Sequence, residues 1–242
     1  MTDLFKRRAG LASVLAASVL LTGCFGDDDD NDSKDKEYYI YEVTVLNATA
    51  GQPFSPLALI AHTNQYKAFT VGEAASTDLE YLAEGGSNSQ ILEGVADDNQ
   101  VHTTLSGEGA VAPGASQTLT LKVEKQDAKS AYLTVLTMLV NTNDAVVAAR
   151  GVNLSDLAVN GYHRMNAIAY DAGTEANTET AATIPGPAGG GEGFNATRDD
   201  RANLVTAHAG VVTSDDGLST SALTHLHRWD NPTAVITVKR TR

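Results

Sequence analysis

The chain has 242 residues, of which 17 are basic and 30 are acidic, giving a formal net charge of −13 at pH 7. So acidic a protein is poorly suited to nucleic acid or to anionic lipid head groups, because they carry charge of the same sign. The single cysteine excludes a disulfide within the chain, and the length is sufficient for one sizeable hydrophobic core.

The first 24 residues have the pattern of a bacterial lipoprotein signal. A basic segment at residues 6–8 precedes an apolar run over residues 11–21, which is too short to cross a bilayer as a mature helix. The sequence Leu-Thr-Gly-Cys then ends at Cys24. We therefore predict a signal peptide over residues 1–23 and lipid attachment at Cys24. The alternative is an ordinary secretory signal in which the cysteine occurs by chance.

Residues 24–37 are predicted to be an acidic, disordered tether between the lipid and a domain over residues 38–242. The run Asp27–Asp30 and the polar residues after it bury too little apolar surface to offset the entropy of ordering. An EF-hand is excluded because no glycine stands where that loop must turn. The residue after the cysteine is Phe25 and not an aspartate, which would retain a lipoprotein at the inner membrane. We therefore expect an outer-membrane location in a bacterial cell envelope.

The first part of the domain predicts two strands and two short helices. Residues 39–47 alternate between apolar and polar side chains, as in a half-buried strand, and a Gly/Pro-rich break precedes a second strand over residues 57–62. Residues 76–85 predict a helix with a serine cap and a terminal glycine. A second helical turn is expected over residues 89–95.

The middle of the domain predicts three strands. Residues 117–123 alternate cleanly, whereas residues 131–140 are almost continuously apolar, which is typical of a central strand buried on both faces. Residues 145–153 are expected to pair with that strand through the turn at residues 141–144.

The last part of the domain adds three more strands, over residues 164–170, 204–212 and 233–239, with a Gly/Pro-rich loop over residues 184–194. Many short strands separated by turn signals, with little helix, predict an all-β protein. The expected architecture is an antiparallel β-sandwich with one or two short helices.

Two of the predicted loops carry three carboxylates. Asp144 ends the turn at residues 141–144, while Asp171 and Glu175 flank a glycine directly after a predicted strand. The glycine allows the backbone to fold back and direct both side chains to one point. Three carboxylates at the loop end of a β-structure can hold a hard cation such as Ca²⁺, which takes oxygen ligands. The alternative is that each acid is simply a solvated loop residue.

Several segments together resemble the spondin N-terminal domain family, over residue 38 to the C-terminus. Single segments are short, but their order and spacing are specific. They are Tyr41–Asn47, Gly51–Pro56, His62, Gly72–Ser76, Leu82–Gly85, Asn143–Asp144, Tyr170–Glu175, Ile184–Pro185 and His227–Pro232.

The resemblance implies an eight-stranded antiparallel β-sandwich like a C2 domain. It also implies one calcium site formed by three acidic side chains, which fall on Asp144, Asp171 and Glu175. The chain departs from the family pattern at Glu175, where aspartate is common, and at Ala145, where an aromatic residue is usual. The cysteines of animal members are absent here.

Other residues suggest different chemistry. His225 and His227 would project to one side of a strand, and His208 could join them in a zinc or iron site. The alternative is a strand start whose histidines make local hydrogen bonds. Glu84 could be a catalytic acid, although a helix end beside a Gly-Gly turn is an ordinary place for a solvated glutamate.

Taken together, the sequence predicts a lipid-anchored envelope protein with a calcium-binding β-sandwich that acts as a binding or adhesion module. We expect no enzymatic activity, no nucleic acid partner, and an unidentified protein or matrix partner. The alternatives are an envelope enzyme that uses the histidines with a transition metal, and a structural lipoprotein without a ligand.

Overall fold

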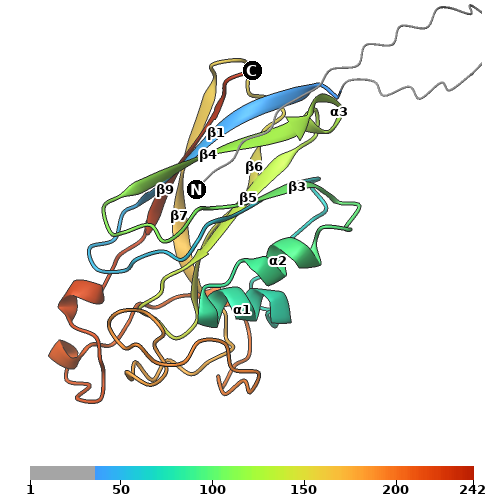
Figure 1. Ribbon diagram of the computed structural model, residues 1–242. Coiled ribbons are helices and arrows are strands. Elements are labelled where there is room, and N and C mark those ends of the chain that lie inside the picture. The colour runs from blue at the N-terminus through green and yellow to red at the C-terminus, as the bar shows by residue number, and fades with distance from the viewer. Residues whose placement is uncertain (1–35) are drawn as a thin grey trace, which may run out of the picture. The chain divides into compact units, whose positions relative to one another are not determined.

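Nine antiparallel strands form two layers that share one strand, β7 (Figure 1). The computed structural model describes residues 36–242, so the predicted signal peptide, Cys24 and most of the tether lie outside the described residues. The strands are β1 (Tyr38–Asn47), β2 (Ala58–His62), β3 (Val101–Ser106), β4 (Ser116–Glu124), β5 (Tyr132–Met138), β6 (Ala145–Asn153), β7 (Tyr162–Asp171), β8 (Thr206–Ala207) and β9 (Ala234–Arg240).

Strand β7 passes from one layer to the other. Its first half pairs with β9, up to the Ala167–Ala234 pair, and its second half pairs with β6, starting at Ile168–Ala148. The strands therefore follow one another in the order β3-β2-β5-β6-β7-β9-β1-β4, a nearly closed arrangement. The two-residue strand β8 adds to the end of β7. The predicted eight-stranded antiparallel sandwich is confirmed.

The main core lies between the two layers. In β1, the alternation seen in the sequence places Tyr41, Val43 and Val45 in this core, while Glu42 points to solvent. Leu121 of the neighbouring strand β4 and Leu133 of β5, in the opposite layer, belong to the same core. Burying apolar surface at about 25 cal/mol per Å² is the main force that holds the layers together.

Two short helices cover the outer face of the layer that contains β3, β2, β5 and β6. Helix α1 (Thr77–Gly85) and helix α2 (Ser89–Gly94) pack Leu82 and Ile91 against outward-facing side chains of β2, β5 and β6. These strands are consequently buried on both faces, which explains why β5 lacks alternation in the sequence. The predicted serine cap of α1 is confirmed, since the Ser76 hydroxyl accepts a hydrogen bond from the backbone N–H of Leu79 at 3.2 Å.

The loops that follow β7 gather with α1 at one end of the sandwich, as Figure 1 shows. This end also contains the turn between β5 and β6. Among the described residues, no helix combines the length and apolar character needed to cross a bilayer.

Some sequence expectations were wrong. The strand predicted over residues 204–212 is reduced to β8, because most of this segment is irregular loop. Residues 225–227 form a turn of 3₁₀ helix instead of a strand start, closed by Thr224 and His227. Strand β3 and the short helix α3 (Lys125–Ala128) were not predicted, so the described residues contain three α-helices instead of one or two.

Candidate metal centre

The turn between β5 and β6 is held firmly by buried polar contacts. The Gln52 side chain accepts a hydrogen bond from the Asn141 backbone N–H and donates one to its carbonyl, both at 3.1 Å. The Thr142 hydroxyl donates to the Leu139 carbonyl at 2.6 Å and accepts from the Ala145 N–H at 3.1 Å. The backbone around Asp144 is therefore fixed from both sides.

Pairing between β6 and β7 brings the two predicted loops together. Ala145 is the register partner of Asp171, so Asp144 lies beside the end of β7. The Ala172 N–H donates to the Asp144 carbonyl at 3.2 Å. Gly173 then reverses the chain direction with a φ angle of +68°. A Cβ atom at this position would lie 2.4 Å from the Leu204 carbonyl oxygen. Only glycine fits this reversal.

The Asp144 side chain is fully buried and receives the returning loop. Its Oδ2 accepts hydrogen bonds from the backbone N–H groups of Thr174 at 2.8 Å and Glu175 at 3.1 Å, and from the Thr174 hydroxyl at 3.3 Å. Its Oδ1 is buried and has no hydrogen-bond partner among the described residues. A buried oxygen left in this way costs free energy unless a donor or a cation meets it.

Asp171 and Glu175 lie in the same loop cluster and are half-buried. Asp171 Oδ1 accepts from the Gly173 N–H at 2.8 Å, and its Oδ2 accepts from the Asn177 side chain at 2.7 Å. The structure thus places all three predicted acids at one end of the sandwich, around the reversal at Gly173.

The electrostatics of this cluster disfavour negative charge. Burial, together with the charge of Asp171, raises the pKa of Asp144 to about 7. Burial, followed by the charge of Glu84, raises the pKa of Glu175 to about 8. A bound cation would reverse both effects, because it favours the ionised form of its ligands.

Two further buried glutamates border the cluster, and sequence reasoning did not assign them to it. The expectation that Glu84 is solvated was wrong, since only 2% of it is exposed. Its Oε2 accepts from the Asn195 N–H at 2.8 Å, while Oε1 has no partner among the described residues. Glu179 is similar: its Oε1 accepts a hydrogen bond from the Val212 N–H, and its Oε2 has no partner among the described residues. Burial, followed by the charge of Asp171, raises the pKa of Glu179 to about 7. Both glutamates are buried by segments distant in sequence, so no local signal could have revealed them.

The three histidines do not come together as a set. His225 Nδ1 lies 3.1 Å from an Asp215 oxygen, and His227 Nδ1 accepts from the Thr224 N–H at 3.0 Å. His208 is buried beside Trp229, with ring centroids 5.1 Å apart. The local hydrogen bonds expected for His225 and His227 are confirmed.

Within residues 36–242, no group of three or more His, Cys, Asp or Glu side chains stands in an arrangement that could hold a metal ion. The carboxylates of Asp144, Asp171 and Glu175 therefore lie near one another without forming a ligand set. Their donor chemistry fits Ca²⁺, which takes carboxylate and carbonyl oxygens, and Asp144 Oδ1 is available. A site around that oxygen would take its other carboxylate ligands from Asp171 and Glu175.

An antiparallel sandwich with acidic loops at one end defines a small β-structured module. The family model described as Spondin_N matches residues 47–186, more than half of the chain. The chain belongs to the spondin N-terminal domain family, which confirms the resemblance seen in the sequence. Asp144, Asp171 and Glu175 all lie inside the matched segment. A comparison with curated proteins finds no match.

Proposed function

We propose that this protein is a lipid-anchored module of the bacterial cell envelope whose spondin domain binds Ca²⁺ through Asp144, Asp171 and Glu175. The observation that carries the proposal is the buried Asp144 carboxylate, which has one oxygen without a partner and lies close enough to Asp171 to feel its charge. Burial of an unpaired charge is unfavourable, and a divalent cation is the simplest group that would compensate it.

The ion would add a further link between two loops that the pairing of β6 with β7 already brings together. Asp144 belongs to the turn before β6, whereas Asp171 and Glu175 flank the reversal after β7. Since an ion that binds only the folded state stabilises it, calcium would brace this end of the sandwich. The braced loops would present a recognition surface for a protein or matrix partner, which is the sense in which we propose a binding or adhesion role without catalysis.

The anchor rests on the sequence of the first 24 residues, with Cys24 as the lipidated residue and the outer membrane as its location. The alternative of a histidine-based metal enzyme receives no support from a specific contact, because His225 and His227 are held by their own neighbours. A structural lipoprotein without a ligand is the remaining alternative.

Thermal melting with and without calcium tests the ion. We expect saturating CaCl₂, at about 100 times the dissociation constant, to add about 2.7 kcal/mol to the unfolding free energy. For a chain of this size, that corresponds to a rise of roughly 5–10 °C in Tm. The Tm of Asp144→Asn should not rise with calcium. Asp97→Asn, the same change at an exposed acid outside the cluster, should keep it. A wild-type Tm that does not respond to calcium would favour the structural alternative.

Fatty-acid labelling tests the anchor. Cells fed an alkyne fatty acid should incorporate it into the wild-type protein and leave Cys24→Ser unlabelled and in the soluble fraction. Equal labelling of both proteins, or labelling of neither, would refute attachment at Cys24.

A further inference from the structure

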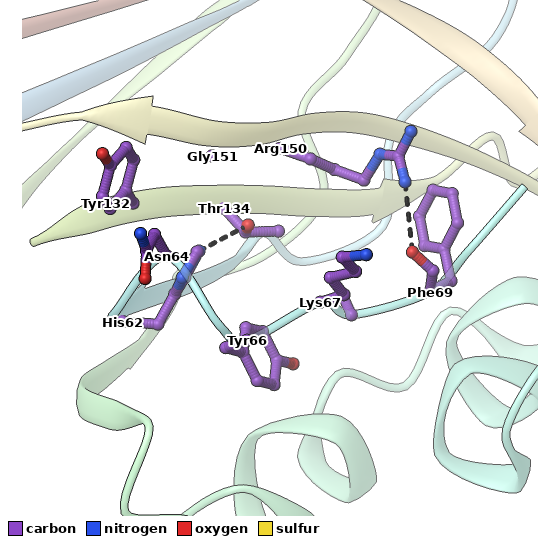
Figure 2. A pocket seen from close by; sticks show the side chains of 10 residues that line it. His62, Asn64, Tyr66, Lys67, Phe69, Tyr132, Thr134, Arg150 and Gly151 are labelled. Atoms are coloured by element: carbon purple, nitrogen blue, oxygen red, sulfur yellow. Dashed lines mark hydrogen bonds between the residues drawn. The ribbon is translucent and has the colours of Figure 1, made fainter.

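A second site lies on the outer face of the layer that contains β2, β5 and β6. It is a cavity of about 280 Å³ bounded by these strands and by the segment that follows β2 (Figure 2). Its volume is just below the usual range of about 300–1,000 Å³ for ligand pockets, which suits a ligand built on a single ring. The residues that define its chemistry are His62, Tyr66, Lys67, Phe69, Tyr132 and Arg150.

One side of the cavity is aromatic. The His62 ring lies 4.9 Å from the Tyr66 ring and 6.5 Å from the Tyr132 ring, measured between centroids. Figure 2 shows these three side chains together, away from Arg150. Burial raises the pKa of Tyr66 to about 12, with smaller contributions from Asp98 and Asp78, so its hydroxyl stays protonated. Neither of these acids lines the cavity.

His62 contributes a ring face and no charge. Its Nδ1 donates to the Thr63 carbonyl at 2.6 Å, and its Nε2 accepts from the Thr134 hydroxyl at 2.8 Å. Burial lowers the pKa of His62, so the imidazole is neutral near pH 7. With both nitrogens occupied, the imidazole can offer a ligand only its π surface.

The other side of the cavity is cationic. Arg150 donates to the Phe69 carbonyl at 3.1 Å and lies over the Phe69 and Tyr170 rings, 4.4 and 5.1 Å from their centroids. These contacts hold the guanidinium in place while leaving part of it exposed. Lys67, whose side chain is exposed, lines the same part of the cavity (Figure 2).

Neither cation is neutralised within residues 36–242. No carboxylate lies within 4.0 Å of Lys67 or Arg150, whereas Arg198 and Arg228 each pair with an acid. None of the residues that line the cavity is acidic. In a protein with a net charge of −13, two unpaired cations beside one cavity mark a place where an anion is favoured.

We propose that this cavity binds a small carboxylate carried on a six-membered ring. The ring lies against Tyr66, Tyr132 and the His62 face, and the carboxylate meets Arg150 and Lys67. A guanidinium matches a carboxylate with two parallel hydrogen bonds, and aromatic walls bind a ring without requiring charge. Such a ligand has two sources, a free aromatic acid or a uronic acid at the end of a polysaccharide.

Ligand titration followed by NMR tests the proposal on the purified protein in EDTA, so that its outcome is independent of calcium. The probes are phenylacetate for the aromatic acid, glucuronate for the uronic acid and 2-phenylethanol as the neutral analogue. We expect at least one carboxylate to bind with a dissociation constant of about 1 mM or lower and to shift the ring signals of Tyr66. The neutral analogue should bind at least tenfold more weakly, and the tighter of the two acids identifies the source.

Two charge-removing variants separate binding from folding. Arg150→Gln and Lys67→Gln should each weaken binding of the carboxylate about tenfold or more, the usual loss for a charge-assisted hydrogen bond. Lys122→Gln, the same change at an exposed position of β4, should have no effect. Lys67 makes no hydrogen bond among the described side chains, so its variant remains informative even if Arg150→Gln perturbs the loop. The proposal is overturned if no carboxylate binds below about 20 mM, if the neutral analogue binds equally well, or if Lys67→Gln matches the wild type.

Discussion

Replacing Asp144 by asparagine should stabilise the calcium-free protein at high pH, although it alters a fully buried residue. The carboxyl group has a pKa of about 7 in the folded protein, caused by burial and then by the charge of Asp171, against 3.8 for the ordinary group. Asparagine has nearly the same shape and never ionises, and its carbonyl oxygen can accept the bonds from Thr174 and Glu175.

The direction in which stability changes with pH follows from proton binding. Because the folded protein holds this proton more tightly than the unfolded chain, the stability it contributes is complete below pH 4 and is lost as pH rises through 7. A pKa raised from 3.8 to about 7 corresponds to a loss of about 4 kcal/mol by pH 8. Asp144→Asn avoids that loss but places an amide N–H group at the position of the unpartnered Oδ1, where a buried donor without an acceptor costs about 1–2 kcal/mol. The expected net gain is therefore about 2–3 kcal/mol, or roughly 5–10 °C in Tm.

Thermal melts in EDTA at pH 4.5 and pH 8 measure this effect. The wild-type Tm should fall between the two pH values by more than the Tm of Asp144→Asn, and the two proteins should melt within a few degrees of each other at pH 4.5. Saturating calcium at pH 8 should remove most of the difference in Tm, because its gain of about 2.7 kcal/mol goes only to the wild type, which retains the carboxylate. Asp97→Asn, which changes an exposed acid, should follow the wild type throughout.

Two results would refute this reasoning. If Asp144→Asn is as destabilising at pH 8 as at pH 4.5 in EDTA, the ionised carboxylate is not disfavoured in the folded state. If saturating calcium at pH 8 raises the Tm of Asp144→Asn as much as that of the wild type, the Asp144 carboxylate does not bind the ion.

Three other substitutions test the supporting structure by chemical denaturation. Gly173→Ala should cost roughly 2 kcal/mol or more, because it combines φ +68 with a Cβ 2.4 Å from the Leu204 carbonyl; an unchanged midpoint would show that the reversal is not required. Arg198→Met should cost about 3–5 kcal/mol, because it removes the guanidinium 2.6 Å from the buried Glu80 carboxylate; adding Glu80→Gln should restore part of the loss, and no restoration would contradict the pairing. Leu133→Ala should cost about 2–5 kcal/mol, because the side chain is fully buried in the main core; a loss below 1 kcal/mol would place it outside that core.

Local signals in the sequence were sufficient for much of the sandwich. Strand β1 alternates cleanly, and α1 has both its serine cap and its terminal glycine turn. Strand β5 was recognised from a continuous apolar run, which the structure explains by burial against the core on one face and against the helices on the other. Each of these features depends on residues close together in the chain.

The missed elements depend on distant contacts. Every residue of β3 is partly or fully exposed, so its sequence has no apolar face to detect, and it forms because β2 offers an edge for pairing. Residues 225–227 have the alternation of a strand, but capping by Thr224 and a bond from the His225 N–H to Asp215 select a 3₁₀ turn.

The candidate metal site is likewise predictable from local sequence signals only in part. The positions of Asp144, Asp171 and Glu175 at loop ends follow from strand and turn signals, so sequence could bring them to one end of the fold. Their burial depends on segments far away in the chain, as does that of Glu84 and Glu179. Sequence therefore predicts where the acids gather, while the raised pKa values that make the cluster testable require the folded structure.

The end of β7 links the two proposed sites and also keeps them separate. Successive residues of a strand face opposite sides, and here Tyr170 stacks on Arg150 at the cavity while Asp171 faces the acidic cluster. Each proposal can then be tested against the other. Asp144→Asn should leave carboxylate binding unchanged, and Lys67→Gln should leave the calcium-induced rise in Tm unchanged. If either substitution abolishes both effects, the two sites are coupled, which refutes the separation inferred from the opposite directions of Tyr170 and Asp171.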